Sequence, residues 1–192
     1  MSKRKLLLFI GDSGSGKSTT ADGIVEKSNG KYSILVSTAT RDMRDGEIEA
    51  KDYYFVDIPT FMSREMIESV EFPPESNRFY GVQASEFDRI KGDMLLVVEP
   101  NGAKQIQEFV STNNLDIEVL IIYMDIPKAD VRKTLLAQGI DKDEVEARLS
   151  RGDIPGDFER LGLKADLPVK KLNKNTVDAI LEWIEYNDEM YG

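Results

Sequence analysis

The chain has 192 residues, a length typical of one domain with small inserted subdomains. Its 35 acidic and 25 basic side chains give a net charge of −10, which argues against non-specific binding to nucleic acid or to anionic membranes. Because it contains neither cysteine nor histidine, disulfides, thiolate metal sites and a histidine base or metal ligand are excluded.

The first predicted element is the apolar run "KLLLFI" (5–10), which we interpret as a buried strand. Its uninterrupted apolar part, "LLLFI", is too short for a targeting segment. No later stretch approaches the length of a membrane span. We therefore expect a cytoplasmic protein with no membrane partner.

The next segment, "GDSGSGKST" (11–19), has the spacing of a phosphate-binding loop: Gly11, four residues, Gly16, Lys17 and Ser18. Glycines let main-chain N–H groups converge on phosphate oxygens, and the helix that follows offers its positive N-terminal end. Lys17 would reach the β- and γ-phosphates of ATP, and the Ser18 hydroxyl would ligate Mg²⁺. The alternative is a glycine- and serine-rich loop with an incidental lysine, but a strand before it and a helix after it favour a nucleotide site.

Strands and helices then alternate along the chain. Continuous apolar runs are typical of central parallel strands, and apolar residues at helical spacing indicate the helices between them. The predicted elements are a helix over 17–27, strands over 32–37 and 93–99, a helix over 103–110, a strand over 117–124, a short strand in 168–172 and a helix over 176–187. This order predicts an α/β fold of the P-loop type, a doubly wound parallel sheet.

Two segments interrupt the alternation. Residues 38–90 are polar, with a strand predicted in "YYFVDI" (53–58) and a short helix in "TFMSREMIESV" (60–70). Residues 128–151 read as two helices joined at Gly139. Both segments follow strand ends, where ligands bind in such sheets.

A second anion site is indicated inside the first of these segments. Arg41 and Arg44 lie three residues apart, with Tyr53 following, in an otherwise acidic protein. Arginine side chains match phosphate oxygens with paired hydrogen bonds. A single arginine would be interpreted as a solvated surface charge, but the two arginines and the tyrosine together favour an anion-binding site.

The string that contains these residues, "STATRDMRDGEIEAKDYYFV" (37–56), resembles the signature of guanylate kinases. The resemblance continues through "IESVEFPPESNRFYG" (67–81), "LLVVEPNGAKQI" (95–106) and the 127–149 segment, and it covers about residues 4 to 186. It implies a core domain of residues 1–37, 91–127 and 152–192, a nucleoside-monophosphate-binding insertion (38–90) and a helical lid (128–151).

The resemblance also implies roles for individual residues. The ATP-phosphate loop would consist of Gly11, Ser13, Gly14, Ser15, Gly16, Lys17, Ser18 and Thr19, with Asn173 near the adenine. The acceptor nucleotide would be held through its phosphate by Arg41, Arg44, Tyr53 and Tyr80, beside Gly81, and at its guanine edge by Ser37 and Glu71. Catalytic roles would fall to Lys17, Arg41, the lid residue Arg148 and Glu99, which could act through Mg²⁺ or on the acceptor.

Several positions depart from the family pattern. Val97 replaces the first acid of its strand, and Val82 replaces a hydroxyl residue that contacts guanine. Thr134 and Gln138 stand where lid arginines usually stand, and Arg132 or Arg151 could substitute for them. Arginines on a transferring phosphate are worth about 10³–10⁵ in rate, so these changes bear on turnover as well as on base choice.

The resemblance predicts an ATP- and Mg²⁺-dependent nucleoside monophosphate kinase that converts GMP or dGMP to GDP or dGDP. Its partners would be small-molecule nucleotides and not nucleic acid, and it would be a monomer or a homodimer. One alternative is the same chemistry on a different or modified purine nucleotide. Two others are a non-catalytic guanylate-kinase-like binding module and a kinase of related fold that acts on a sugar phosphate.

Overall fold

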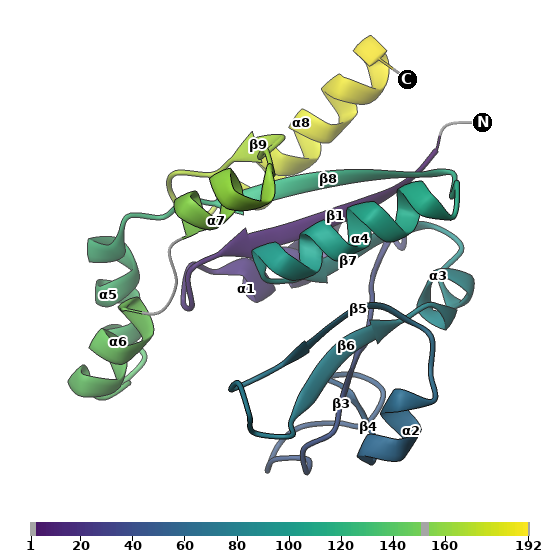
Figure 1. Cartoon of the computed structure of the whole chain (residues 1–192). Coiled ribbons are helices and arrows are strands. Elements are labelled where there is room, and N and C mark those ends of the chain that lie inside the picture. Colours follow the sequence, from purple (N-terminus) through teal and green to yellow (C-terminus); the bar gives the residue numbers. More distant parts are fainter. Residues whose placement is uncertain (1–2, 151–153, 192) are drawn as a thin grey trace.

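The computed structural model describes residues 3–150 and 154–191 and contains a parallel core sheet beside a smaller sheet (Figure 1). The core sheet has the order β2-β7-β1-β8-β9, and every neighbouring pair is parallel. Its strands are β1 (Arg4–Gly11), β2 (Tyr32–Ile34), β7 (Asp93–Val97), β8 (Ile117–Met124) and β9 (Leu167–Pro168).

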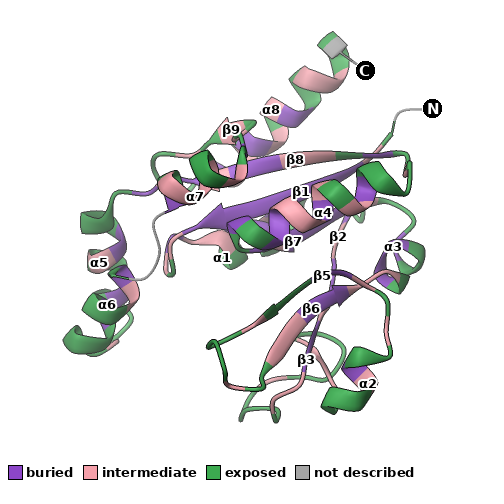
Figure 2. Ribbon diagram, in the orientation of Figure 1, coloured by how far each residue is buried: buried purple, intermediate pink, exposed green. Residues whose placement is uncertain are grey.

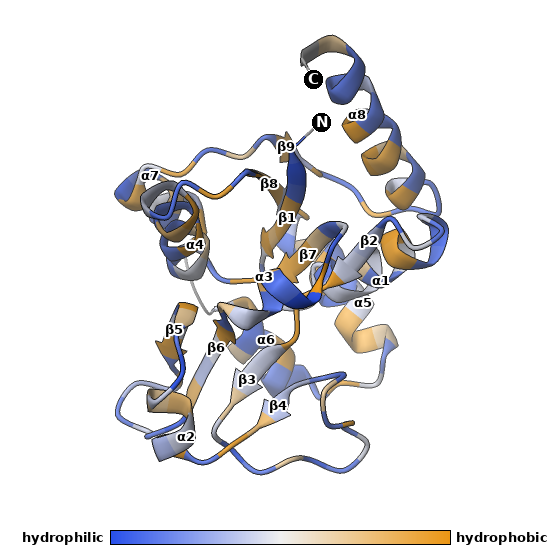
Figure 3. Cartoon of the chain, turned by 90° about the vertical axis from the view of Figure 1, so that its right-hand side faces the viewer, coloured by the Kyte–Doolittle hydropathy of each residue, from blue (hydrophilic) through white to orange (hydrophobic). Residues whose placement is uncertain are grey.

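Alternate residues of β1 build the two halves of the core. Leu6, Leu8 and Ile10 pack in a cluster with α4 (Pro100–Thr112) and α7 (Ile154–Leu161), whereas Leu7 and Phe9 pack in a second cluster with α1 (Lys17–Lys27) and α8 (Thr176–Tyr191). The central strands β1, β7 and β8 carry most of the buried residues of the core sheet in Figure 2 and are mostly hydrophobic in Figure 3. Helices on both faces of a parallel sheet make this the predicted doubly wound P-loop fold.

The smaller sheet has the order β4-β3-β6-β5 and lies below the core sheet in Figure 1. It lies within residues 37–83, which matches most of the predicted insertion. Its elements are β3 (Ser37–Ala39), β4 (Tyr54–Phe55), α2 (Ile58–Met62), β5 (Met66–Glu71) and β6 (Phe79–Gln83), and α3 (Ser85–Arg89) leads back to the core.

Two further helices, α5 (Lys128–Ala137) and α6 (Lys142–Leu149), follow β8 and project to the left in Figure 1. They form the helix pair predicted for this segment, with Gly139 at positive φ in the turn between them. Whether these helices and the smaller sheet act as separate domains stays a prediction.

Three predicted elements were wrong in their extent. The strand predicted in 168–172 shares only Pro168 with β9. The strand predicted over 32–37 divides into β2 and β3, which belong to different sheets. The helix predicted over 60–70 contains only the end of α2, because Asp57 caps that helix and Ser63 ends it. The rest of the segment pairs with β6 as β5, so tertiary pairing overrides its helical spacing.

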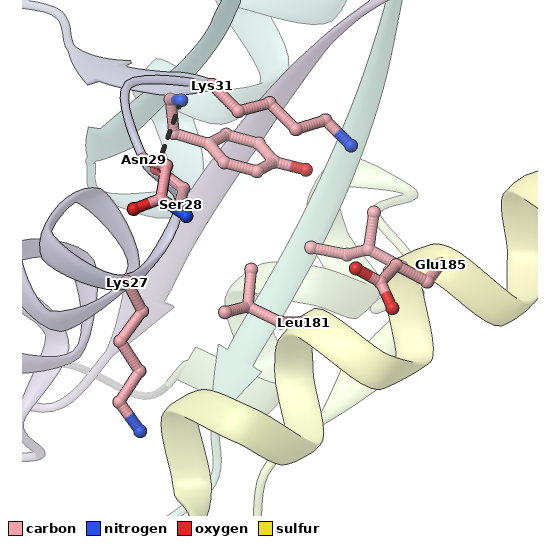
Figure 4. A pocket seen from close by; sticks show the side chains of 8 residues that line it. Lys27, Ser28, Asn29, Lys31, Leu181 and Glu185 are labelled. Carbon is pink, nitrogen blue, oxygen red and sulfur yellow. Dashed lines mark hydrogen bonds between the residues drawn. The ribbon is translucent and has the colours of Figure 1, made fainter.

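No helix in the described ranges is long and apolar enough to cross a membrane. A cavity of about 180 Å³ lies between the turn after α1 and helix α8. Figure 4 shows Lys27, Ser28, Asn29 and Lys31 on one side of it and residues of α8 on the other. None of the predicted site residues lines this cavity.

Candidate functional site

The predicted phosphate-binding loop connects β1 to α1, and its glycines are required by its shape. Gly14 and Gly16 have φ values of +84° and +82°, a left-handed conformation that L side chains rarely adopt. A Cβ at Gly14 would lie 2.7 Å from Leu135 of α5, and one at Gly16 would lie 2.6 Å from Leu172. Both positions therefore favour glycine, for their backbone conformation and for the space beside them.

Lys17, at the start of α1, folds back over this loop. Its Nζ donates hydrogen bonds to the main-chain oxygens of Gly11 (2.6 Å) and Asp12 (2.9 Å). Burial lowers the pKa of Lys17, and the negative charges of Glu99 and Asp12 oppose that shift. The Ser15 hydroxyl is buried in the same loop without a hydrogen-bond partner among the described residues. The ammonium group of Lys17 over a glycine-rich loop fits a site for phosphate oxygens.

Glu99 lies just beyond the end of β7, where it is the N-cap residue of α4. Loss of hydration raises the pKa of Glu99, and the nearby charge of Lys17 acts in the opposite direction. The structure therefore brings the predicted acid and the predicted lysine into one electrostatic environment. Within the described residues, no group of three acidic side chains forms a metal site. A magnesium ion here would depend on the nucleotide phosphates and on Ser18.

Arg41, Tyr53 and Tyr80 come together in the smaller sheet. The Arg41 guanidinium lies 5.1 Å from the centre of the Tyr53 ring and 5.4 Å from that of Phe55. The rings of Tyr53 and Tyr80 meet edge to face at 6.0 Å. Hydrogen bonds from Arg41 to Glu47 raise the pKa of this arginine, so it stays charged. Arg44 is exposed nearby.

The sheet register decides which side chains share a face. Ser37 pairs with Val82, and Val82 pairs with Glu68, so these three residues form one row across β3, β6 and β5. Residues directly opposite one another project from the same face, and so does Tyr80, two residues from Val82. Glu71 pairs with Phe79 and therefore projects from the other face.

The two glutamates of β5 thus have different surroundings. Glu71 accepts a hydrogen bond from the main-chain N–H of Asn77 within its own hairpin, at 2.7 Å. Glu68 is 7% exposed, and its carboxylate lies against Gly102 in the first turns of α4. Burial raises the pKa of Glu68 to about 7, although the main-chain N–H of Val82 favours its charged form.

The family resemblance implied Glu71 at the guanine edge and did not select Glu68. The register nevertheless pairs Glu68 directly with Val82. The available signal was a single acid in the apolar context of "MIE" (66–68). The structure brings Ser37, Tyr80 and Glu68 to one face of the sheet and leaves Glu71 on the other.

The lid arginines are engaged in ion pairs. Arg132 pairs with Glu146, joining α5 to α6, and Arg148 pairs with Glu144 within α6. Thr134 and Gln138 are exposed on or just beyond α5. Arg151, the other possible substitute, lies outside the described residues.

Asn173 follows Leu172, whose side chain packs against Gly16 of the phosphate-binding loop. The Asn173 side-chain oxygen accepts a hydrogen bond from the N–H of Asn175 at 2.8 Å. This position is next to the loop, as expected for a residue near the donor nucleotide.

The chain resembles known proteins over most of its length. The family model described as guanylate kinase matches residues 3–151. Proteins named guanylate kinase from Prochlorococcus marinus (strain MIT 9312) and Trichodesmium erythraeum (strain IMS101) are each 31% identical to it; the matches cover 90% and 94% of this chain and 96% and 94% of those proteins. The crystal structure of guanylate kinase from Anaplasma phagocytophilum shares the fold, with a TM-score of 0.63, 24% identity and coverage of 97% of this chain and 87% of that one. The chain belongs to the guanylate kinase family of nucleoside monophosphate kinases.

Proposed function

We propose that this protein transfers the γ-phosphoryl group of ATP to GMP or dGMP and releases GDP or dGDP. The observation that carries this proposal is that one chain holds two separate groups of residues suited to binding phosphate. One is the glycine loop with Lys17, and the other is the cluster of Arg41 with Tyr53 and Tyr80. Membership of the guanylate kinase family supports it and does not favour the binding-module or sugar-phosphate alternatives.

The residues of the loop fit ATP. Main-chain N–H groups and the Lys17 ammonium would meet the β- and γ-phosphate oxygens, and the Ser18 hydroxyl would hold Mg²⁺. The ion would neutralise part of the phosphate charge. The acceptor oxygen is already anionic at neutral pH, so the chain needs no general base, and positioning with charge stabilisation would carry the reaction.

We assign recognition of the base to Glu68 with Ser37, in place of the Glu71 expected from the sequence. A carboxylate can accept hydrogen bonds from both N1–H and the 2-amino group of guanine. Adenine has no N1–H, so it cannot satisfy the same carboxylate. The cross-strand row of Ser37, Val82 and Glu68 supports this assignment, because it sets the carboxylate on the face that also bears Tyr80. Val82 is fully buried in the core cluster and offers no polar contact.

The test is a panel of phosphorylation rates with ATP and Mg²⁺ against GMP, dGMP, IMP, AMP and 2-aminoadenine monophosphate. We expect GMP or dGMP to have the highest kcat/KM. A tenfold preference for AMP or a pyrimidine nucleotide would overturn the assigned base. Lys17→Ala should abolish turnover, since alanine cannot neutralise phosphate charge. Its matched control is Lys27→Ala, which removes the same charge at an exposed pair with Asp178 and should leave turnover unchanged.

The cellular location in the cytoplasm and the monomeric or homodimeric state stay predictions. Light scattering of the purified protein at two concentrations would decide the second.

A further inference from the structure

We propose that Glu47 is a positioning residue for the acceptor phosphate, and that it acts by holding Arg41 and the main chain of Arg44 in their binding arrangement. The proposal rests on the proposed function, because it assigns the phosphate of the acceptor nucleotide to this arginine pair. Glu47 was not among the residues selected from the sequence.

A tight turn brings Glu47 back onto the arginine pair. The N–H of Glu47 donates to the Arg44 oxygen at 3.1 Å, and the N–H of Arg44 donates to Glu47 Oε2 at 2.7 Å. Gly46 has a φ of +87°, which glycine adopts without strain inside such a turn. The main chain of this turn therefore holds the Glu47 carboxylate in place without any contribution from the Arg41 side chain.

The Glu47 carboxylate also accepts hydrogen bonds from the end of the Arg41 side chain. Nη1 of Arg41 donates to Oε2 at 2.6 Å and Nη2 donates to Oε1 at 2.5 Å, a paired arrangement. The Arg41 side chain is 8% exposed, and Tyr53 and Phe55 cover its guanidinium. Hydrogen bonds from Arg41 and then from Arg44 lower the pKa of Glu47 to about 2, so the pair stays charged at neutral pH.

The pairing occupies both terminal nitrogens of Arg41 and leaves little of its guanidinium exposed. Glu47 takes the end of the guanidinium that carries Nη1 and Nη2, whereas Nε is buried without a hydrogen-bond partner in the described part of the chain. Tyr80 interacts with the same guanidinium. A phosphate would therefore meet the small part of the Arg41 guanidinium that is still exposed and the exposed side chain of Arg44, while Glu47 holds both arginines in place. In a competing role, Glu47 would occupy the place of the phosphate and would have to move away before the nucleotide binds. Removing the charge of Glu47 would then lower the KM for GMP.

The first test measures steady-state kinetics of Glu47→Gln, which keeps the size of the side chain but removes its charge. We expect the KM for GMP to rise about tenfold or more, because Arg41 loses a paired charged contact, while the KM for ATP changes less than about twofold. The matched control is Asp45→Asn, which removes a neighbouring exposed charge of the same turn and should behave as wild type. An unchanged or lower KM for GMP in Glu47→Gln would overturn the proposal.

Two further measurements separate positioning from a general loss of structure. On an Arg41→Ala background, Glu47→Gln should add less than about twofold to the KM for GMP, since the residue through which it acts is absent. In the nucleotide-free protein, hydrogen exchange of the Arg41 Nε–H, followed by NMR, should speed up about tenfold in Glu47→Gln and return toward wild type in Glu47→Asp. Unchanged exchange of the Arg41 Nε–H in Glu47→Gln would overturn the proposal, even if GMP proves to be the wrong acceptor. Failure of the proposed function would instead appear as wild-type protein that does not phosphorylate GMP.

Discussion

A buried carboxylate costs free energy unless partners compensate for its lost hydration, and Glu68 has little compensation. It accepts from the Val82 N–H, and its pKa is raised to about 7 by burial. A guanine edge that offers two N–H groups would supply the missing partners. On the proposed assignment, the cost of burying Glu68 would be offset when the base binds.

The burial of Glu68 predicts a pH dependence of stability. Between the ordinary pKa of a glutamate and about 7, the folded protein keeps a proton on Glu68 that the unfolded chain releases. The free energy of unfolding should therefore fall by up to about 3 kcal/mol as the pH rises through this range. Above this range, the stabilising contribution of protonated Glu68 should be lost. Urea unfolding at pH 5, 6, 7 and 8 would measure the fall.

The matched variants are Glu68→Gln and Glu71→Gln. Glu68→Gln should remove this part of the pH dependence, because an amide does not titrate. Glu71→Gln, on the opposite face of the same strand, should retain it. Equal slopes in wild type and Glu68→Gln would show that Glu68 is not buried as described.

At the scale of elements, one side chain links the two sheets where the chain passes between them. Glu86 of α3 accepts hydrogen bonds from the Val36 N–H (2.7 Å) and the Tyr54 hydroxyl (3.1 Å). Arg89 pairs with both carboxylate oxygens and also donates to the Ile34 oxygen at 3.1 Å. The outgoing and returning segments of the smaller sheet are thereby tied together at one carboxylate.

Glu86→Gln should lower the free energy of unfolding by about 2–3 kcal/mol, because it removes a buried charge from its paired arginine. Denaturant unfolding at pH 7 measures this loss. Asp88→Asn, an exposed change in the same short helix, should cost no more than about 0.5 kcal/mol. A loss in Glu86→Gln no larger than that of the control would mean that the junction is held by packing alone.

For the whole molecule, the central requirement is that two phosphate groups from different nucleotides meet in line. The lid helix α5 already touches the phosphate-binding loop through Leu135 and Gly14. Its arginine, Arg132, is paired with Glu146, so it would have to exchange partners to reach a transferring phosphate. Neither the core nor the smaller sheet alone can exclude water from the reaction.

We therefore expect the smaller sheet and the α5–α6 pair to approach each other when both nucleotide sites are filled. Small-angle scattering with a bisubstrate analogue should show a smaller radius of gyration than the free protein. Arg41→Ala, which should not bind the acceptor end, provides the control and should compact less. An unchanged radius in the wild type would contradict closure.

The sequence by itself determined the core fold and indicated the glycine loop as the donor site, because both depend on local patterns. The glycines of 11–19 and the apolar runs at 5–10 and 117–124 act over a few residues, so the loop and strands could be predicted from them. Family resemblance then named the acceptor residues, of which Arg41, Tyr53 and Tyr80 do lie together.

Only the tertiary structure decided which acid faces the acceptor site and what holds the arginines. Whether Glu68 or Glu71 shares a face with Ser37 depends on the pairing of β5 with β6, and a change of one residue in register would reverse the faces. The contact of Glu47 with Arg41 likewise depends on a turn that folds the chain back on itself. Such choices are made by hydrogen bonds between strands and across turns, which no local pattern of residues specifies.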